Sequence, residues 1–191
     1  YRIIKFSFVS VLTGIVRTAV VFWMPTYLAQ YLGFSPQDSG LIFTVATFVI
    51  SSSAFLAVLI YERLNRNMDL VLFLFFAGSA LSFVGVYLIE QPMLNICLLI
   101  LAILFNNCAA SMLWSIYCPS LRDTGMVSGA TGYLDFMSYM AAAVSSTLFA
   151  NAVTGIGWKN LVLVWLALMA AGVIVALPFG KKQVIKRPWE K

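Results

Sequence analysis

Arg17 lies in the middle of an apolar stretch of about 26 residues, Phe6–Tyr31. A bilayer core takes about 20 helical residues to cross, so the stretch predicts a membrane-spanning helix. Counting about 1.5 Å per residue from Phe6 puts the arginine roughly 16 Å along the helix, near the midplane. An arginine there costs about 2.5–3.5 kcal/mol on insertion scales, and such residues usually face the bundle interior or a water-filled path. Two interpretations remain open: Arg17 binds an anion, or it belongs to a structural ion pair.

Asp135 is the second charge inside an apolar stretch. It lies about eight residues, roughly 12 Å, from the start of its stretch, and is therefore expected within one helical turn of the depth of Arg17. Four interpretations remain open. Asp135 forms a structural salt bridge with Arg17, takes up and releases a proton, contacts a cationic or hydroxyl group of a solute, or is a solvated carboxylate without a role.

The composition is that of a membrane protein. Hydrophobic residues make up 62% of the chain, charged residues 10%, and the mean hydropathy is +0.95. Soluble domains carry about 25% charged residues. The basic residues form no patch for nucleic acid, and Cys97, Cys108 and Cys118 have no metal-ligand spacing. The chain has no histidine, which excludes a Ser–His protease dyad and histidine metal sites, and it has no nucleotide-binding glycine motif. We therefore expect no catalytic residue, no metal, no cofactor and no enzyme activity.

Six apolar stretches are expected to span the membrane in a single all-α domain covering residues 1–191. They are residues 6–31, 40–61, 70–89, 94–117, 127–153 and 161–179, followed by a tail at 180–191. An even number of spans puts both termini on one side. Ten of the 12 basic residues fall on that side: Arg2, Lys5, Arg63, Arg66, Arg122, Lys181, Lys182, Lys186, Arg187 and Lys191. Only Lys159 lies on the other. The positive-inside rule therefore predicts a multi-pass protein of the plasma (inner) membrane with both termini cytoplasmic.

Polar residues follow four of the six stretches at helical spacing, whereas the third and sixth are almost wholly apolar. Polar side chains in spans turn toward one another or toward water, so spans one, two, four and five are expected to line something polar, with the third and sixth facing lipid. Two spans with polar residues followed by one apolar span occur twice along the chain, which suggests a three-plus-three internal repeat. Ordinary hydrogen bonding between helices explains any single stripe equally well. The candidate cavity-lining or coupling residues are Thr13, Asn107, Ser111, Trp114, Asp135 and Tyr139.

Three local motifs sharpen the pattern. Val16–Leu28 carries an arginine and then Trp-x-Pro-Thr-Tyr-Leu after five residues. This string resembles the first helix of the C-terminal half of organophosphate:phosphate antiporters, which belong to the major facilitator superfamily. Residues 125–132 resemble their glycine-rich next-to-last helix, and the turn at 155–158 resembles the Gly-Trp before their last helix. The resemblance covers essentially the whole chain, and the first motif is the most specific.

The resemblance implies the C-terminal six-helix half of a transporter, with the N-terminal half absent here. In the family, the arginine matching Arg17 is one of two that bind the substrate phosphate, one from each half. Several members also have a tyrosine three residues earlier, where this chain has Gly14, and Glu62–Asn67 is a partial version of their loop motif. The expected function is secondary transport of a small organic anion, such as a phosphate ester exchanged for phosphate, by alternating access. The alternatives are a proton-coupled carrier of another polar solute that uses Asp135, and a non-transporting membrane scaffold or channel.

Overall fold

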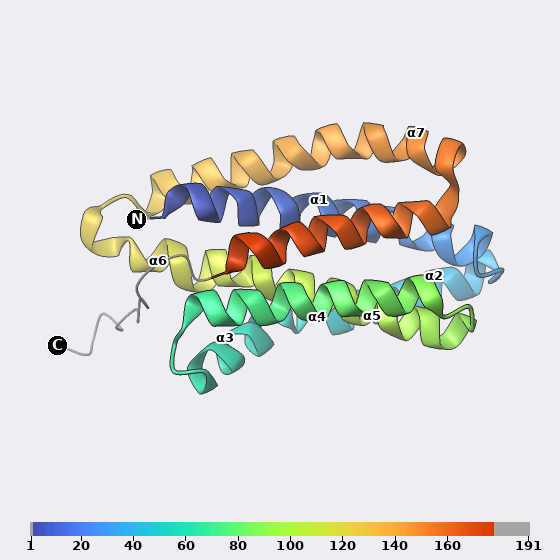
Figure 1. Cartoon of the computed structure of the whole chain (residues 1–191), viewed down its shortest axis with the longest axis horizontal. Coiled ribbons are helices and arrows are strands. Elements are labelled where there is room, and N and C mark those ends of the chain that lie inside the picture. Colours follow the sequence, from blue (N-terminus) through green and yellow to red (C-terminus); the bar gives the residue numbers. More distant parts are fainter. Residues whose placement is uncertain (1, 178–191) are drawn as a thin grey trace.

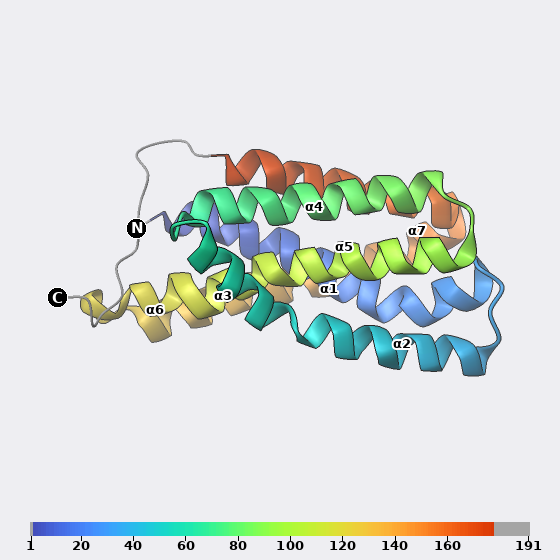
Figure 2. The same cartoon turned by 90° about the horizontal axis from the view of Figure 1, so that it is seen from below.

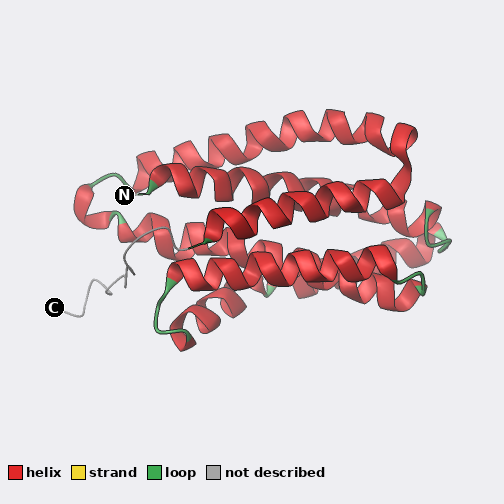
Figure 3. Ribbon diagram, viewed as in Figure 1, coloured by secondary structure: helices red, strands yellow, loops and turns green. Residues whose placement is uncertain are grey.

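A computed structural model of the chain describes residues 2–177, apart from the side chain of Thr154. The described part consists of helices joined by short loops, without a β-strand (Figure 3). Six helices in it are long and apolar enough to cross a membrane, which confirms the predicted all-α class and the number of spans. The predicted tail at 180–191 and the last two residues of the predicted sixth span lie outside the described residues.

Two helices begin at a residue whose side chain caps the first turn. The Ser35 hydroxyl accepts a hydrogen bond from the Asp38 amide (3.1 Å) with Pro36 in the first turn, and the Asn67 side chain accepts one from the Leu70 amide (3.3 Å). The helices are α1 (Ile3–Gln30), α2 (Pro36–Ser51), α3 (Ser53–Arg63), α4 (Met68–Leu88), α5 (Pro92–Met112), the π-helix η1 (Leu113–Tyr117), α6 (Cys118–Ser120), the 3₁₀ helix η2 (Arg122–Thr124) and α7 (Val127–Ala176).

Helix α7 contains two spans, Val127–Val153 and Gly155–Ala176, and turns back between them (Figure 1). Gly157 lies at the turn with φ 77° and ψ 167°, a backbone conformation that residues with a Cβ rarely adopt. The turn predicted at residues 155–158 is therefore confirmed. We refer below to the first and second parts of α7.

The second span, predicted as the apolar stretch 40–61, breaks at Ser52 into α2 and α3, which meet at a visible angle (Figure 2). The Ser51 hydroxyl donates to the Thr47 carbonyl (2.8 Å) and the Ser52 hydroxyl to the Val49 carbonyl (2.7 Å). Serine hydroxyls that bond back to the preceding turn bend helices. In addition, the Ser53 carbonyl accepts from the Cys108 thiol (3.4 Å), which holds α3 against α5.

The fourth span, predicted to end at Tyr117, continues to Ser120 through a π-helical turn. Within this turn the Cys118 amide donates to the carbonyl of Leu113, five residues back. Pro119 accounts for the widening because it has no N–H to donate to the carbonyl of Ser115 and its ring crowds that carbonyl.

The helices form three layers (Figure 2). Helix α4 and the second part of α7 lie on one side, α2 lies on the opposite side, and α1 and α5 run between them. Gly172 of α7 fits directly against the Phe76 ring of α4, and the rings of Phe83 and Trp165 lie 6.0 Å apart. The least covered spans are the second and fifth: 22% of the residues in an apolar 18-residue window of each are buried, against 44% and 33% for the third and sixth. The apolar third span thus supplies large aromatic side chains to the bundle as well as an outer face.

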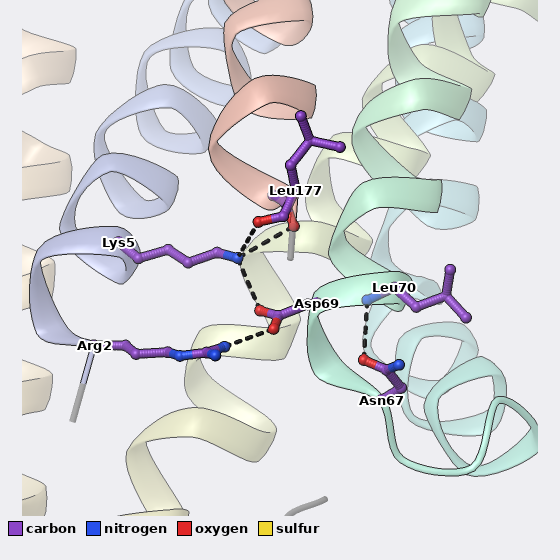
Figure 4. A network of polar contacts seen from close by, with 7 residues as sticks. Arg2, Lys5, Asn67, Asp69, Leu70 and Leu177 are labelled. Atoms are coloured by element: carbon purple, nitrogen blue, oxygen red, sulfur yellow. Dashed lines mark hydrogen bonds and ion pairs between the residues drawn. The ribbon is translucent and has the colours of Figure 1, made fainter. Parts of the chain in front are cut away.

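An ionic cluster ties three helices together at the end of the bundle that holds Arg2 and Leu177, which we call the terminal end (Figure 4). The Lys5 ammonium donates to Asp69 (2.8 Å) and to the carbonyls of Ala176 (3.1 Å) and Leu177 (3.2 Å). Arg2 donates to the other carboxylate oxygen of Asp69. The last carbonyls of a helix have no partner within it, so Lys5 satisfies two such groups while it joins α1 to α4 and α7.

Candidate functional site

Helix α1 runs parallel to the first part of α7 in very close contact. The Ser10 hydroxyl donates to the Leu134 carbonyl (2.7 Å), and an added Cβ on Gly14 would overlap the Ser138 side chain and lie 2.9 Å from the Ser138 carbonyl oxygen. The same offset of 124 residues separates both pairs, which fixes the register of the two helices. Small residues permit this approach, and the glycine at position 14 is therefore explained by packing.

Helix α5 passes α1 on another side, in the antiparallel direction. The Asn106 amide group donates to the Thr13 carbonyl (3.2 Å). Toward the far end the Tyr27 hydroxyl donates to Asn95 (2.8 Å), and toward the terminal end the ring of Phe6 lies 3.8 Å from that of Tyr117. These contacts place Ser111 between the levels of Thr13 and Phe6.

The helical position of Arg17 places it on the side of α1 between α5 and α7. It lies three residues after Gly14, which faces α7, and four residues after Thr13, whose carbonyl meets α5. Residues three and four apart are neighbours on one helix face, so Arg17 continues both contacts one turn further along α1. The side chain is partly exposed, and within residues 2–177 it makes no hydrogen bond and no ion pair. The bundle therefore holds an arginine without a protein partner near the middle of its first span.

Asp135 lies on α7 at the edge between α1 and α6. It directly follows Leu134, which bonds to Ser10 of α1, and Thr131 one turn earlier lies at the thiol of Cys118 in α6. Helix α6 continues the line of η1 and α5. The carboxylate is partly exposed and, like Arg17, makes no hydrogen bond or ion pair with any described residue.

The sequence predicts that Arg17 and Asp135 lie within one helical turn of each other in depth. The register of α1 and α7 shows that they lie further apart. The offset of 124 puts Asp135 level with Val11, six residues or about 9 Å below Arg17 along the helix axis. The sequence estimate failed because α1 begins at Ile3, three residues before the predicted start, which places Arg17 further along its helix. The two charges form no ion pair in the described structure, so a structural salt bridge does not account for either of them.

Two of the remaining predicted residues, Thr13 and Asn107, lie largely inside the bundle. The Thr13 side chain is buried, and its hydroxyl donates a hydrogen bond to the Val9 carbonyl (2.8 Å) within α1 itself. Asn107 is partly buried, and its side-chain carbonyl oxygen is shielded from solvent without a hydrogen-bond partner. Its neighbour Asn106, which sequence reasoning passed over, is fully buried and has an unpartnered carbonyl oxygen as well. Two adjacent asparagines in an apolar span were the available signal.

The other predicted residues lie closer to the terminal end. Ser111 and Trp114 are partly exposed, and Trp114 falls within the π-helical turn η1. Tyr139 is 63% exposed, one turn after Asp135 on the open side of α7. The structure thus brings Arg17 and Asp135 to the region bounded by α1, α5–α6 and α7, with Ser111 near the level of Asp135, and it leaves Tyr139 on the outside.

The chemistry of this region is that of binding. A guanidinium offers five donors in a planar fork that matches carboxylate and phosphate oxygens, and a carboxylate accepts from ammonium and hydroxyl groups. The shielded oxygens of Asn106 and Asn107 add acceptors beside the level of Thr13. No protein-family model and no curated protein sequence matches this chain.

Proposed function

We propose that this chain is the C-terminal six-helix half of a secondary transporter of the major facilitator superfamily, similar to organophosphate:phosphate antiporters, and that it moves a small organic anion by alternating access. Phosphate esters exchanged for phosphate are the first candidates. The observation that carries the proposal is Arg17, a cation in an apolar bundle that has no hydrogen-bond or ion-pair partner among the described residues.

The energetics favour an anionic ligand over a structural role. A charge taken out of water without a partner is costly, and proteins retain such groups where a ligand or an internal water-filled space satisfies them. A bidentate contact between a guanidinium and a phosphate or carboxylate supplies two charge-assisted hydrogen bonds. In a region of reduced dielectric, this contact is among the strongest available to a small solute.

The missing partner is a second six-helix half, which would cover the second and fifth spans. These are the least buried spans of the described chain, and α2 carries the exposed hydroxyls of Thr44, Thr47 and Ser51 along one face. We assign the terminal end to the cytoplasm, because it holds five of the seven Lys and Arg residues in the described part of the chain. The substrate would then bind between the two halves in the plasma membrane.

The test is substrate uptake by the complete transporter in liposomes. Arg17→Lys keeps the charge but loses the planar fork, so uptake of the phosphate ester should fall sharply. Arg17→Ala should abolish uptake while membrane insertion is preserved, since the change removes an insertion cost. Arg122→Ala, an exposed arginine at the terminal end, is the matched control and should transport normally. Normal uptake by Arg17→Ala, or a simple cation as substrate, would refute the proposal and favour a scaffold.

A proton-coupled carrier is the second candidate, and the unpartnered carboxylate of Asp135 favours it. In such a carrier, Asp135 takes up a proton on one side of the membrane and releases it on the other. A pH gradient across the liposome should then drive uptake, and Asp135→Asn should remove this driving force while exchange at equal pH persists. Uptake that ignores the pH gradient in the unaltered protein would exclude this candidate.

A further inference from the structure

Arg17 and Asp135 carry opposite charges, and the bundle holds them apart. Arg17 and Asp135 each lack a hydrogen bond and an ion pair among the described residues. Opposite charges within reach of one another in an apolar bundle attract strongly, so their separation must be imposed by the surrounding helices. The parallel register of α1 and α7 imposes it: the residues lie about 9 Å apart along the helix axis.

The register itself is rigid at this place. Gly14 and Ser138 are packed backbone against side chain, and the hydrogen bond from Ser10 to the Leu134 carbonyl pins the adjacent turn. Sliding α7 by six residues to bring Asp135 level with Arg17 would break this bond and the fitted contact between Gly14 and Ser138. The separation is therefore a property of the fold.

Both charges border the same region of the bundle. Arg17 lies on α1 between the face that contacts α7 and the face that contacts α5. Asp135 lies on α7 between the face that contacts α1 and the face that contacts Cys118. Cys118 belongs to α6, which continues the line of α5. A ligand lying along α1 on this side could thus reach the guanidinium with one end and the carboxylate with the other.

We propose that the solute bound at Arg17 is bipolar: an anion carrying, a short chain away, an ammonium group or another strong donor that bonds to Asp135. This inference rests on the proposed transport function and names the chemical class of its substrate. A simple anion would satisfy Arg17 and leave the carboxylate alone, whereas a bipolar solute of suitable length gives both charges a partner.

The experiment compares ligands that differ only in the second charge. Binding of 2-aminoethyl phosphate, 4-aminobutyl phosphate, ethyl phosphate and inorganic phosphate is measured on the complete transporter in detergent by calorimetry. One charge-assisted hydrogen bond should favour at least one aminoalkyl phosphate over ethyl phosphate by about 10-fold or more. Asp135→Asn should remove this preference and leave the affinity for ethyl phosphate within about threefold. Glu90→Gln, an exposed carboxylate at the far end that pairs with Lys159, is the matched control and should retain the preference.

The outcomes separate this inference from the proposed function. If the unaltered protein binds ethyl phosphate through Arg17 but shows no preference for either aminoalkyl phosphate, the bipolar substrate is refuted and the anion site stands. The same holds if Asp135→Asn keeps the preference. If Arg17→Gln leaves the binding of phosphate and its esters unchanged, the anion site itself fails. Equal melting temperatures of the variants in detergent show that each comparison is made on folded protein.

Discussion

The closest helix contact in the bundle predicts that Gly14→Ala destabilises the protein. A Cβ at this position overlaps the Ser138 hydroxyl and lies 2.9 Å from the Ser138 carbonyl oxygen and 3.2 Å from its Cα. Two of these three atoms belong to the backbone, so relief requires α1 and α7 to move apart. Overpacking of this kind costs about 1–3 kcal/mol.

The magnitude follows from a comparison with a second glycine. Replacing glycine by alanine inside a helix also gains about 1 kcal/mol of helix propensity, which partly hides the packing cost. Gly40 in α2 is the matched control, because a Cβ added there meets no atom within 4 Å. Gly40→Ala should be neutral or stabilising by up to about 1 kcal/mol. The difference in unfolding free energy between the two variants then isolates the packing term of about 1–3 kcal/mol.

The assay is reversible unfolding of the complete protein in mixed micelles, followed by tryptophan fluorescence. A second variant locates the effect: Ser138→Ala removes the overlapping hydroxyl but not the backbone atoms, so it should restore part of the stability lost in Gly14→Ala. The reasoning is refuted if Gly14→Ala is as stable as Gly40→Ala, because α1 and α7 would then have room for a Cβ at position 14.

Three further predictions concern the two ends of the bundle. Asn95→Leu removes the bond from Tyr27 and two bonds to backbone carbonyls, so it should lower the unfolding free energy by about 2–3 kcal/mol; a loss under about 0.5 kcal/mol would contradict this network. Asp69→Asn removes the shared partner of the two cations of α1 and should cost about 1–3 kcal/mol in the same unfolding assay, whereas a neutral result would show that the cluster adds nothing. A cysteine introduced at Glu90 should react with a membrane-impermeant maleimide in intact cells and one at Arg63 should not, and the reverse labelling would invert the proposed orientation.

The sequence predicted the helices well because the length of an apolar stretch is set by the bilayer and not by neighbouring helices. All six spans occur where the hydropathy places them, and Gly157 provides the turn between the last two. The helices start two to four residues earlier than predicted at Ile3, Pro36 and Pro92, and the last two of these starts have a proline in the first turn.

Two irregularities escaped the sequence reasoning although each had a local signal. Three consecutive serines, residues 51–53, break the second span, and Pro119 widens the fourth into a π-helical turn. Each of these residues is also tolerated in a regular membrane helix, because a hydroxyl can bond within its own turn and neighbouring groups can satisfy a freed carbonyl. Whether the helix bends depends on the packing around it, which here includes the bond from Cys108 to the Ser53 carbonyl.

By itself, the sequence determined that Arg17 is a charge inside the first span and that Asp135 is one inside the fifth, because burial of a charge follows from the apolar residues around it. It could not determine whether the two meet. That depended on the register of α1 against α7, which the contacts of Ser10 with Leu134 and of Gly14 with Ser138 set. A helix rises only about 1.5 Å per residue, so a difference of a few residues in register separates an ion pair from two residues offset by about 9 Å along the helix axis. Helix periodicity is a local property of the chain, whereas register is decided by the packing of side chains that lie more than a hundred residues apart.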